Sequence, residues 1–204
     1  MPSSVKRVYF GDHVFVVDEN VYEPAEDSFL FAENLEVDSG ERVFDMGTGC
    51  GILGILAAEK AQDVIAVDVN PYAVRCAKEN AKLNNMQNKI YYVQGDLFTP
   101  LSEGSKFDVI LFNAPYLPAN EREPDSWIGR AWAGGTTGRQ VINLFISEAS
   151  KHLKPAGRVL LMQSTLANVN ETLRRFAEHH LTARIVADRA LPFFETVALI
   201  EARI

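Results

Sequence analysis

The fold is decided by one stretch of the sequence, VFDMGTGCG at residues 43–51. It begins as an apolar run and ends in closely spaced glycines, after which Ile52, Ile55 and Leu56 recur at helical spacing. This pattern predicts a strand, a tight turn and a helix in direct succession. Glycines at such a turn let the backbone bend sharply and let a ligand approach without meeting a Cβ atom.

The rest of the chain alternates between strand and helix patterns. The last two predicted strands, 182–188 and 196–202, are separated by too few residues for a crossover helix, so we expect them to pair antiparallel. The sequence therefore predicts an α/β fold, a Rossmann-like doubly wound sheet that is mostly parallel, with one antiparallel C-terminal strand and a small N-terminal hairpin. The other predicted elements are strands at 64–68, 90–93, 109–112 and 159–162, a hairpin of 8–10 with 14–17, a helix capped by Asn70-Pro71, a helix over 141–149, and a helix opened by a capping box of Asn168 and Glu171.

Length and composition narrow the possibilities. With 204 residues, we expect a single domain over 1–204, with the hairpin and a flap in 1–38 and the core in 39–204. The net charge of -7 argues against nucleic-acid binding by phosphate neutralisation alone. No apolar run approaches the ~18 residues of a membrane span, so we expect no membrane association and a cytoplasmic location. The 2 cysteines form no Cys/His cluster, so no metal site is predicted.

Acidic residues follow three successive predicted strands. Asp45 and Asp68 end the first two, and Asp96 lies just past the third. Open α/β sheets bind ligands at the edge where these strand ends meet. Residues 49–54 also satisfy GxGxxG, so a nicotinamide-dependent oxidoreductase is an alternative, and Asp68 suits the ribose of either ligand. A carboxylate at Asp45, however, repels a pyrophosphate and attracts an ammonium or sulfonium group, which favours S-adenosylmethionine.

A second signature, Asn113-Ala114-Pro115-Tyr116, follows the fourth sheet strand. It resembles the [N/D/S]-P-P-[Y/F] motif of methyltransferases that modify a planar nitrogen. Such a nitrogen has a delocalised lone pair, so the site must accept its N–H bonds and hold it in line with the departing sulfur. The Asn113 side-chain oxygen and the Ala114 carbonyl are the candidate acceptors, and Tyr116 can stack on the planar group. Alanine in place of the family's usual proline at 114 is expected to loosen the turn.

Two further segments make the resemblance more specific: VYEPAEDS at 21–28 and AWAGGTTGR at 131–139. Over nearly its whole length the chain resembles the archaeal and eukaryotic branch of the HemK-type protein glutamine methyltransferases. This resemblance implies the class I methyltransferase fold, S-adenosylmethionine as cofactor, and methylation of the glutamine in the Gly-Gly-Gln loop of a class I translation termination (release) factor. Residues 24–27 would close over the cofactor, although Glu26 and Asp27 also suit the first turn of a helix.

The resemblance also implies roles for single residues. With Gly49 added from the glycine turn, the expected cofactor contacts are Ser28, Asp45, Gly47, Gly49, Asp68, Asp96, Leu97 and Asn113. The expected catalytic motif is Asn113, Ala114, Pro115 and Tyr116, and the expected substrate contacts are Asn113, Tyr116 and Trp132. Positioning carries the rate and no general base is needed, because the methylated nitrogen loses its proton readily.

Other readings remain open at the level of sequence. The same planar slot suits an exocyclic amine of an RNA or DNA base, and a non-catalytic cofactor-binding subunit is a further alternative. The long segment 117–137 has no strong period, which indicates a functional loop. The resemblance implies one more partner, a small zinc-binding activator protein that pairs with an edge strand at Ile90-Tyr91-Tyr92-Val93.

Overall fold

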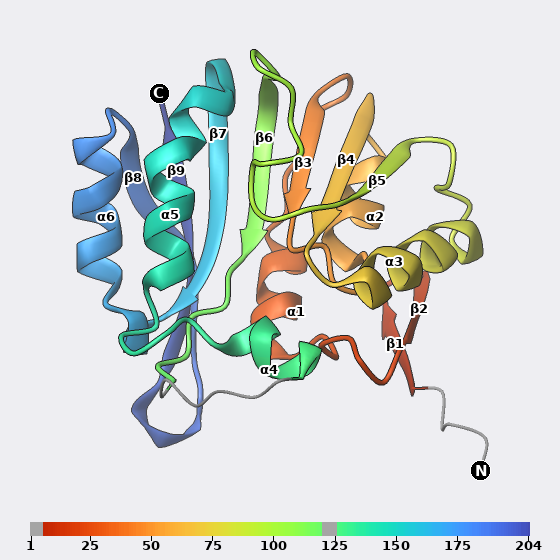
Figure 1. Cartoon of the computed structure of the whole chain (residues 1–204), viewed down its shortest axis with the longest axis horizontal. Helices are drawn as coiled ribbons and strands as arrows, with labels where there is room; N and C mark the ends of the chain where they lie inside the picture. The colour runs from red at the N-terminus through yellow and green to blue at the C-terminus, as the bar shows by residue number, and fades with distance from the viewer. Residues whose placement is uncertain (1–5, 120–125) are drawn as a thin grey trace.

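A computed structural model of the chain describes residues 6–119 and 126–204. At its centre lies a seven-stranded sheet in the order β5-β4-β3-β6-β7-β9-β8 (Figure 1). Neighbouring strands are parallel except at β9, which runs antiparallel to both β7 and β8. The predicted sheet with one antiparallel C-terminal strand is therefore confirmed. The strands are β3 (Arg42–Met46), β4 (Asp63–Asp68), β5 (Ile90–Gln94), β6 (Phe107–Asn113), β7 (Leu153–Ser164), β8 (Thr182–Ala190) and β9 (Thr196–Arg203).

Helices cover both faces of this sheet (Figure 1). One face carries α1 (Glu26–Glu33), α2 (Ile52–Ala58) and α3 (Pro71–Leu83), and the other carries α5 (Gln140–Ala149) and α6 (Val169–Glu178). Along β6, Val109 and Leu111 belong to the first of these two cores, and Ile110 and Phe112 belong to the second. Both faces of the strand are buried, which explains its unbroken apolar sequence.

The N-terminal hairpin, β1 (Lys6–Phe10) with β2 (His13–Val17), is held against α3. The side-chain amide of Asn80 accepts from the N–H of Val16 at 2.8 Å and donates to its carbonyl at 2.9 Å. Asn84 does the same for Val14. Asn80 also donates to the carbonyl of Cys50 in the glycine turn, so the hairpin, α3 and the turn form one unit.

Both predicted N-cap residues, Asn70 and Asn168, cap their helices in the structure. Asn70 caps α3 by accepting from the N–H of Tyr72, and Asn168 caps α6 by accepting from the N–H of Glu171. The predicted capping box is wrong in its second half, because the Glu171 carboxylate binds Arg174 and Arg175 instead of returning to Asn168. Asn168 has a left-handed backbone, and its own N–H donates to the carbonyl of Thr165.

The segment 117–137 is more regular than predicted. It contains a short helix, α4 (Trp127–Trp132), whose N-cap Ser126 accepts from the N–H of Gly129. A helix of this length is too short to produce a visible apolar period. The short 3-10 helices are η1 (Ser150–His152), η2 (Thr165–Ala167) and η3 (Pro192–Phe194). Within the described residues, no helix has the length and apolar character needed to cross a membrane.

Candidate active site

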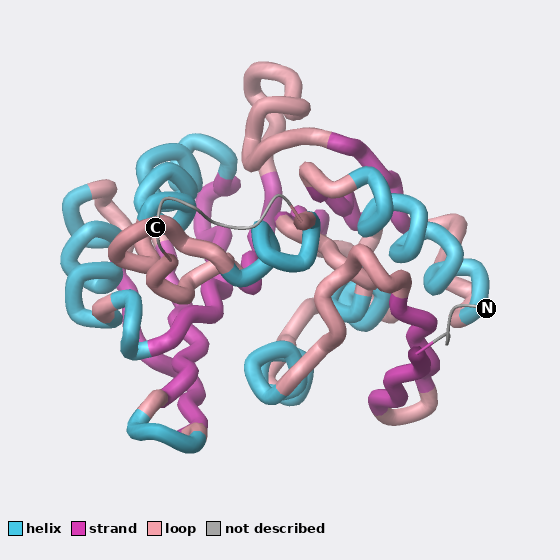
Figure 2. Tube along the Cα trace, turned by 60° about the horizontal axis from the view of Figure 1, so that its bottom comes forward, coloured by secondary structure: helices cyan, strands magenta, loops and turns pink. Residues whose placement is uncertain are grey.

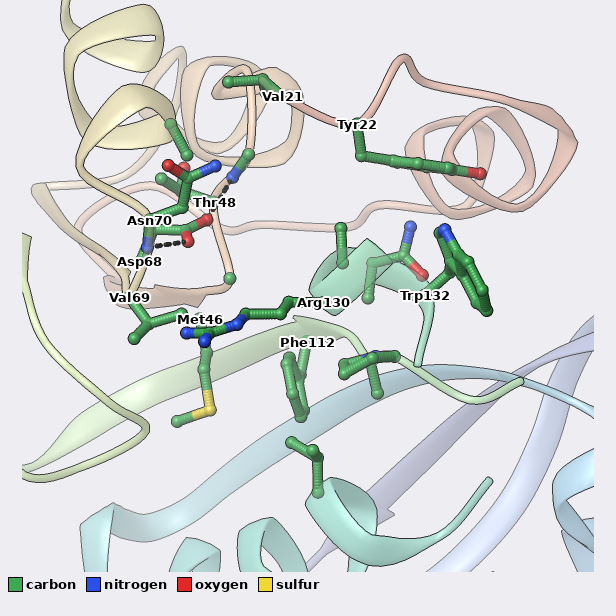
Figure 3. Close-up of a pocket in the computed structure, with 18 of the residues that line it drawn as sticks. Val21, Tyr22, Met46, Thr48, Asp68, Val69, Asn70, Phe112, Arg130 and Trp132 are labelled. Atoms are coloured by element: carbon green, nitrogen blue, oxygen red, sulfur yellow. Dashed lines mark hydrogen bonds between the residues drawn. The ribbon is translucent and has the colours of Figure 1, made fainter. Parts of the chain in front are cut away.

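A pocket of about 660 Å³ opens at the carboxyl edge of the sheet (Figure 3). The ends of β3, β4 and β6 form its floor, and the segment before α1 and helix α4 form its walls. Its volume lies in the range of small-molecule sites. Of the predicted site residues, Ser28, Gly47, Gly49, Asp68, Asp96, Leu97, Asn113, Ala114, Pro115, Tyr116 and Trp132 line this pocket. Asp45 does not, because it lies 1% exposed beneath the glycine turn.

The glycine turn joins the pocket to the helices below it. Gly49 and Gly51 both have left-handed backbones, with φ of 56° and 90°. A Cβ atom on Gly51 would lie 3.0 Å from the Cβ of Ala77 in α3, whereas a Cβ atom on Gly49 would meet nothing nearer than the Gly47 carbonyl oxygen at 3.9 Å. Gly51 therefore permits close helix packing, and Gly49 presents bare backbone to the pocket.

Asp68 joins the glycine turn to the end of β4. Its carboxylate accepts from the N–H of Gly49 and from the N–H of Asn70, each at 2.9 Å. Burial raises the pKa of Asp68, and these backbone hydrogen bonds oppose that rise. Each carboxylate oxygen retains lone-pair capacity, which suits a pair of ribose hydroxyl groups.

Asp45 is a buried carboxylate with one unsatisfied oxygen. Thr48 donates to its Oδ2 at 2.5 Å, whereas Oδ1 has no hydrogen-bond partner within residues 6–119 and 126–204. Burial raises the pKa of Asp45 to about 7, against the opposing bonds from Thr48 and from the Gly54 backbone. A Cβ atom on Gly54 would lie 2.7 Å from Oδ2, so the last glycine of GxGxxG makes room for this carboxylate.

A second group of side chains surrounds Asp27 at the other end of the pocket. Asp27 accepts from Nδ2 of Asn113 at 3.2 Å, from the hydroxyl of Tyr116 at 3.2 Å and from the hydroxyl of Tyr22 at 3.3 Å. Asn113 Nδ2 also donates to the hydroxyl of Ser28 at 3.1 Å. Burial, with the charge of Asp27, raises the pKa of both tyrosines, which keeps them neutral donors.

These contacts fix the orientation of the Asn113 side chain. An ionised carboxylate only accepts hydrogen bonds, so Asp27 requires the NH₂ of Asn113 to face it and the oxygen to face away. That oxygen, Oδ1, is buried and has no partner in the part of the chain that the structure describes. Asn113 lines the pocket, so the site holds an unused acceptor of the kind that an amide N–H requires.

The segment 131–138 is built onto the Asn113 turn. The N–H of Leu117 donates to the carbonyl of Trp132, and the N–H of Gly134 donates to the carbonyl of Leu117, both at 2.9 Å. A Cβ atom on Gly138 would lie 2.2 Å from the carbonyl oxygen of Tyr116, so only glycine permits this contact. In Figure 3, Trp132 and Tyr22 lie together on one side of the pocket, away from Asp68.

Ala114 does not simply loosen the turn, as we expected from its replacement of proline. Its N–H donates to the carbonyl of Met162 at 3.4 Å, which continues the pairing of β6 with β7 by one residue. A proline has no N–H and could not make this bond. The alanine therefore exchanges ring stiffness for one more hydrogen bond.

The sequence did not single out Asp27 as the centre of the second group, nor Tyr22 or Arg130 as pocket residues. Glu26 and Asp27 are neighbouring acids at the start of α1, but Glu26 is exposed and Asp27 is buried. No local pattern separates them, because the partners of Asp27 come from β6 and the turn after it. Arg130 extends from α4 into the pocket in the view of Figure 3.

The groups in and beneath the pocket suit a nucleoside that carries a positive charge. Asp68 offers acceptors for a ribose, the glycine turn offers bare backbone, and the unsatisfied Asp45 carboxylate supplies negative charge without a partner cation. In the described residues, no group of three His, Cys, Asp or Glu side chains is suited to hold a metal ion.

Comparisons with known proteins agree with this chemistry. Residues 28–115 match the family described as ribosomal protein L11 methyltransferase (PrmA). The chain is 42% identical over 181 residues to the "Putative protein N5-glutamine methyltransferase" of Methanocaldococcus jannaschii, covering 88% of this chain and 90% of that protein. It is 32% identical over 166 residues to the human methyltransferase HEMK2, covering 76% and 77%.

Among solved structures, the chain is similar to one from the Mtq2-Trm112 complex of E. cuniculi, which methylates the termination factor eRF1. The TM-score is 0.69 at 26% identity, and the match covers 90% of this chain and 98% of that one. The identity to the archaeal relative extends over nearly all of both proteins. The chain therefore belongs to the archaeal and eukaryotic branch of the HemK-type protein glutamine N5-methyltransferases, which are class I S-adenosylmethionine-dependent enzymes.

Proposed function

We propose that this enzyme methylates the glutamine of the Gly-Gly-Gln loop in a class I translation termination factor. The buried, unpartnered Oδ1 of Asn113 carries the proposal, because it is an acceptor set for one N–H of a glutamine amide within the described site. The relatives support the acceptor protein: the E. cuniculi complex methylates eRF1.

In this mechanism, Asn113 Oδ1 and the backbone carbonyl of Ala114 accept the two N–H bonds of the glutamine amide. Tyr116 and Trp132 bound the planar group, since both line the pocket and the residue after Tyr116 donates its N–H to the carbonyl of Trp132. When bound, S-adenosylmethionine supplies the methyl group from a positively charged sulfur. The amide nitrogen would form its bond to the methyl group as the bond from that methyl to sulfur breaks, which leaves a neutral thioether, and the methylated amide would then lose one N–H proton to water. The protein's contribution is to orient the nitrogen and exclude other nucleophiles.

The opposite end of the pocket holds the cofactor in this proposal. Asp68 accepts from the ribose hydroxyls, Asp96 accepts from the adenine amino group, and Leu97 packs beside the ring. The turn at Gly47 and Gly49 lies against the methionine part, with Ser28 across the pocket. Asp45 acts from beneath the turn through its charge, which is strong in a buried setting.

The replacement Asp27→Asn tests how Asn113 is oriented. An asparagine at 27 presents either an oxygen or an NH₂ to Asn113, so the Asn113 amide is free to flip and offer a donor to the substrate. We expect kcat to fall about tenfold or more with little change in the cofactor Kd. Asp38→Asn, the same change at an exposed acid outside the pocket, is the matched control. An unchanged kcat in Asp27→Asn would show that Asp27 does not position the amide.

We also propose that a small zinc-binding activator, of the kind that Trm112 represents in the E. cuniculi complex, pairs with β5. β5 is the terminal strand of the sheet, and Tyr91 is 61% exposed there. Tyr92 is already engaged, because its hydroxyl donates to the carbonyl of Ala77. Coexpression with the activator should give a 1:1 complex by size exclusion, and Tyr91→Lys should weaken it, whereas separate elution of the two wild-type proteins would contradict the pairing.

The decisive test of the proposed function is a methyl-transfer assay with labelled S-adenosylmethionine. The acceptors are a class I release factor, the same factor with the Gly-Gly-Gln glutamine changed to alanine, RNA and DNA, each with and without the activator. We expect label only on the unaltered factor. Label on RNA or DNA alone, or equal label on the glutamine-to-alanine factor, would refute the glutamine assignment.

A further inference from the structure

The hairpin between β8 and β9 ends in two fully exposed aromatic side chains. Phe193 is 96% exposed and Phe194 is 104% exposed. Both residues have left-handed backbones, with φ of 63°, a conformation that bulky residues rarely adopt. Figure 2 shows the hairpin extending beyond the rest of the chain. Two adjacent phenylalanines presented in this way form an apolar surface without cover in the described protein.

The base of the hairpin is fixed, so the backbone that carries the two rings is held at this edge of the sheet. The N–H of Leu191 donates to the carbonyl of Glu195 at 2.8 Å, which closes the loop. Arg189 binds Glu26 at 2.9 Å and Glu33 at 2.7 Å, which ties β8 to both ends of α1. The N–H of Thr196 donates to the hydroxyl of Thr165 at 3.1 Å. A surface ordered before binding loses less entropy when a partner docks.

The hairpin tip lies at the same edge of the sheet as the active site. β9 begins opposite the end of β7, with Val197 paired to Ser164, so the loop before β9 extends past the carboxyl edge. Glu26, which binds Arg189, directly precedes Asp27. Asp27 holds Asn113 and Tyr116, and these three residues border the part of the pocket that we call the substrate slot. The charge of Glu195 at the base of the tip also contributes to the raised pKa of Tyr22 and of Tyr116.

We propose that Phe193 and Phe194 dock the methyl-acceptor protein, by entering an apolar recess on its surface outside the glutamine loop. This inference rests on the proposed function. A protein that delivers a glutamine to Asn113 must approach this edge of the sheet, and its adjoining surface then meets the hairpin tip. The core of this enzyme holds the reacting amide, and the tip selects which protein presents it.

The charges around the tip define the partner's chemistry further. Glu26, Glu33, Asp188 and Glu195 surround its base, and Arg189 is the cation among them. This acidic surround favours an acceptor whose recess is bordered by basic residues. It also disfavours an anionic membrane surface, which attracts basic and not acidic protein surfaces.

The double variant F193S/F194S tests the proposal in steady-state methyl transfer. We expect KM for the whole release factor to rise about tenfold or more, while kcat is retained. With a short Gly-Gly-Gln peptide as acceptor, which cannot reach the tip, kcat/KM should equal that of the wild type. L144S is the matched control, because Leu144 is 55% exposed on α5 and lies outside the pocket. Thermal unfolding of both variants establishes that they are folded.

Each result decides the matter. An unchanged KM for the whole factor in F193S/F194S would overturn the docking surface and leave the proposed function intact. A parallel loss with the peptide would also overturn it, because the tip would then act on the slot itself. No labelling of the factor by the wild type would refute the proposed function and the docking partner together. Sedimentation of the wild type with anionic phospholipid vesicles, lost in F193S/F194S, would assign the tip to a membrane instead.

Discussion

Replacing Asn113 by alanine is expected to lower kcat for glutamine methylation by about 10²–10³-fold. The variant removes the buried Oδ1 that has no other partner in the described structure and that the proposal assigns to the acceptor N–H. Without it, the amide nitrogen is held only by the carbonyl of Ala114, and its other N–H bond is buried without an acceptor. Single-turnover methyl transfer measures this loss apart from product release.

The same variant should leave cofactor binding almost intact. Asn113 is itself an expected cofactor contact, but Asp68 and the glycine turn keep their own hydrogen bonds in the variant. Titration calorimetry should therefore give a Kd for S-adenosylmethionine within about fivefold of the wild type. Gln62→Ala removes an exposed amide between α2 and β4 and is the matched control. A kcat within a factor of about three of the wild type would remove Asn113 from the mechanism.

Replacing Asp45 by asparagine is expected to stabilise the cofactor-free protein above pH 7. Burial raises the pKa of Asp45 to about 7, whereas an unfolded aspartate titrates near 4. Ionising the folded carboxyl therefore costs stability as pH rises from about 4 to about 7, and the full cost remains above that range. Asparagine carries no charge, so at pH 8 we expect the variant to be more stable by about 1–3 kcal/mol, with a smaller difference at pH 5.

The Asp45→Asn variant is also expected to bind the cofactor more weakly than the wild type. Without the carboxylate, the cationic cofactor loses a buried negative charge beneath the turn, and we expect its Kd to rise about 10–100-fold at pH 8. In the wild type the affinity should fall as pH drops below about 7, because Asp45 becomes neutral. Thermal unfolding at pH 5 and pH 8, with and without S-adenosylmethionine, measures both effects. Equal differences in Tm at the two pH values would show that Asp45 stays ionised.

Residues whose structural role depends on their neighbours in the sequence could be predicted. The run from Val43 to Gly51 gives a strand and a turn wherever it lies, and Asp68 follows from its place at the end of the next strand. The GxGxxG pattern at 49–54 also admitted a nicotinamide oxidoreductase. Family membership decides against that class, and the position of Gly54 over Asp45 explains why the pattern occurs in a different kind of enzyme.

Residues whose structural role depends on partners far away in the sequence could not be predicted. Asp27 binds Asn113, which lies 86 positions away in the sequence. Its neighbour Glu26 has the same charge but is exposed and binds Arg189 instead. Phe193 and Phe194 are apolar, so composition alone places them in a core. Their exposure comes from the left-handed turn at the tip, which depends on the register of β8 and β9.

The fixed orientation of the Asn113 amide has a consequence for acceptor proteins whose glutamine has deamidated. Asn113 cannot flip while Asp27 holds its NH₂, so the oxygen that faces the pocket only accepts hydrogen bonds. A glutamine that has deamidated to glutamate presents carboxylate oxygens there, and two acceptors repel each other. The slot is therefore expected to reject the deamidated side chain, although its shape is nearly identical, and to methylate only acceptor proteins whose glutamine is chemically intact.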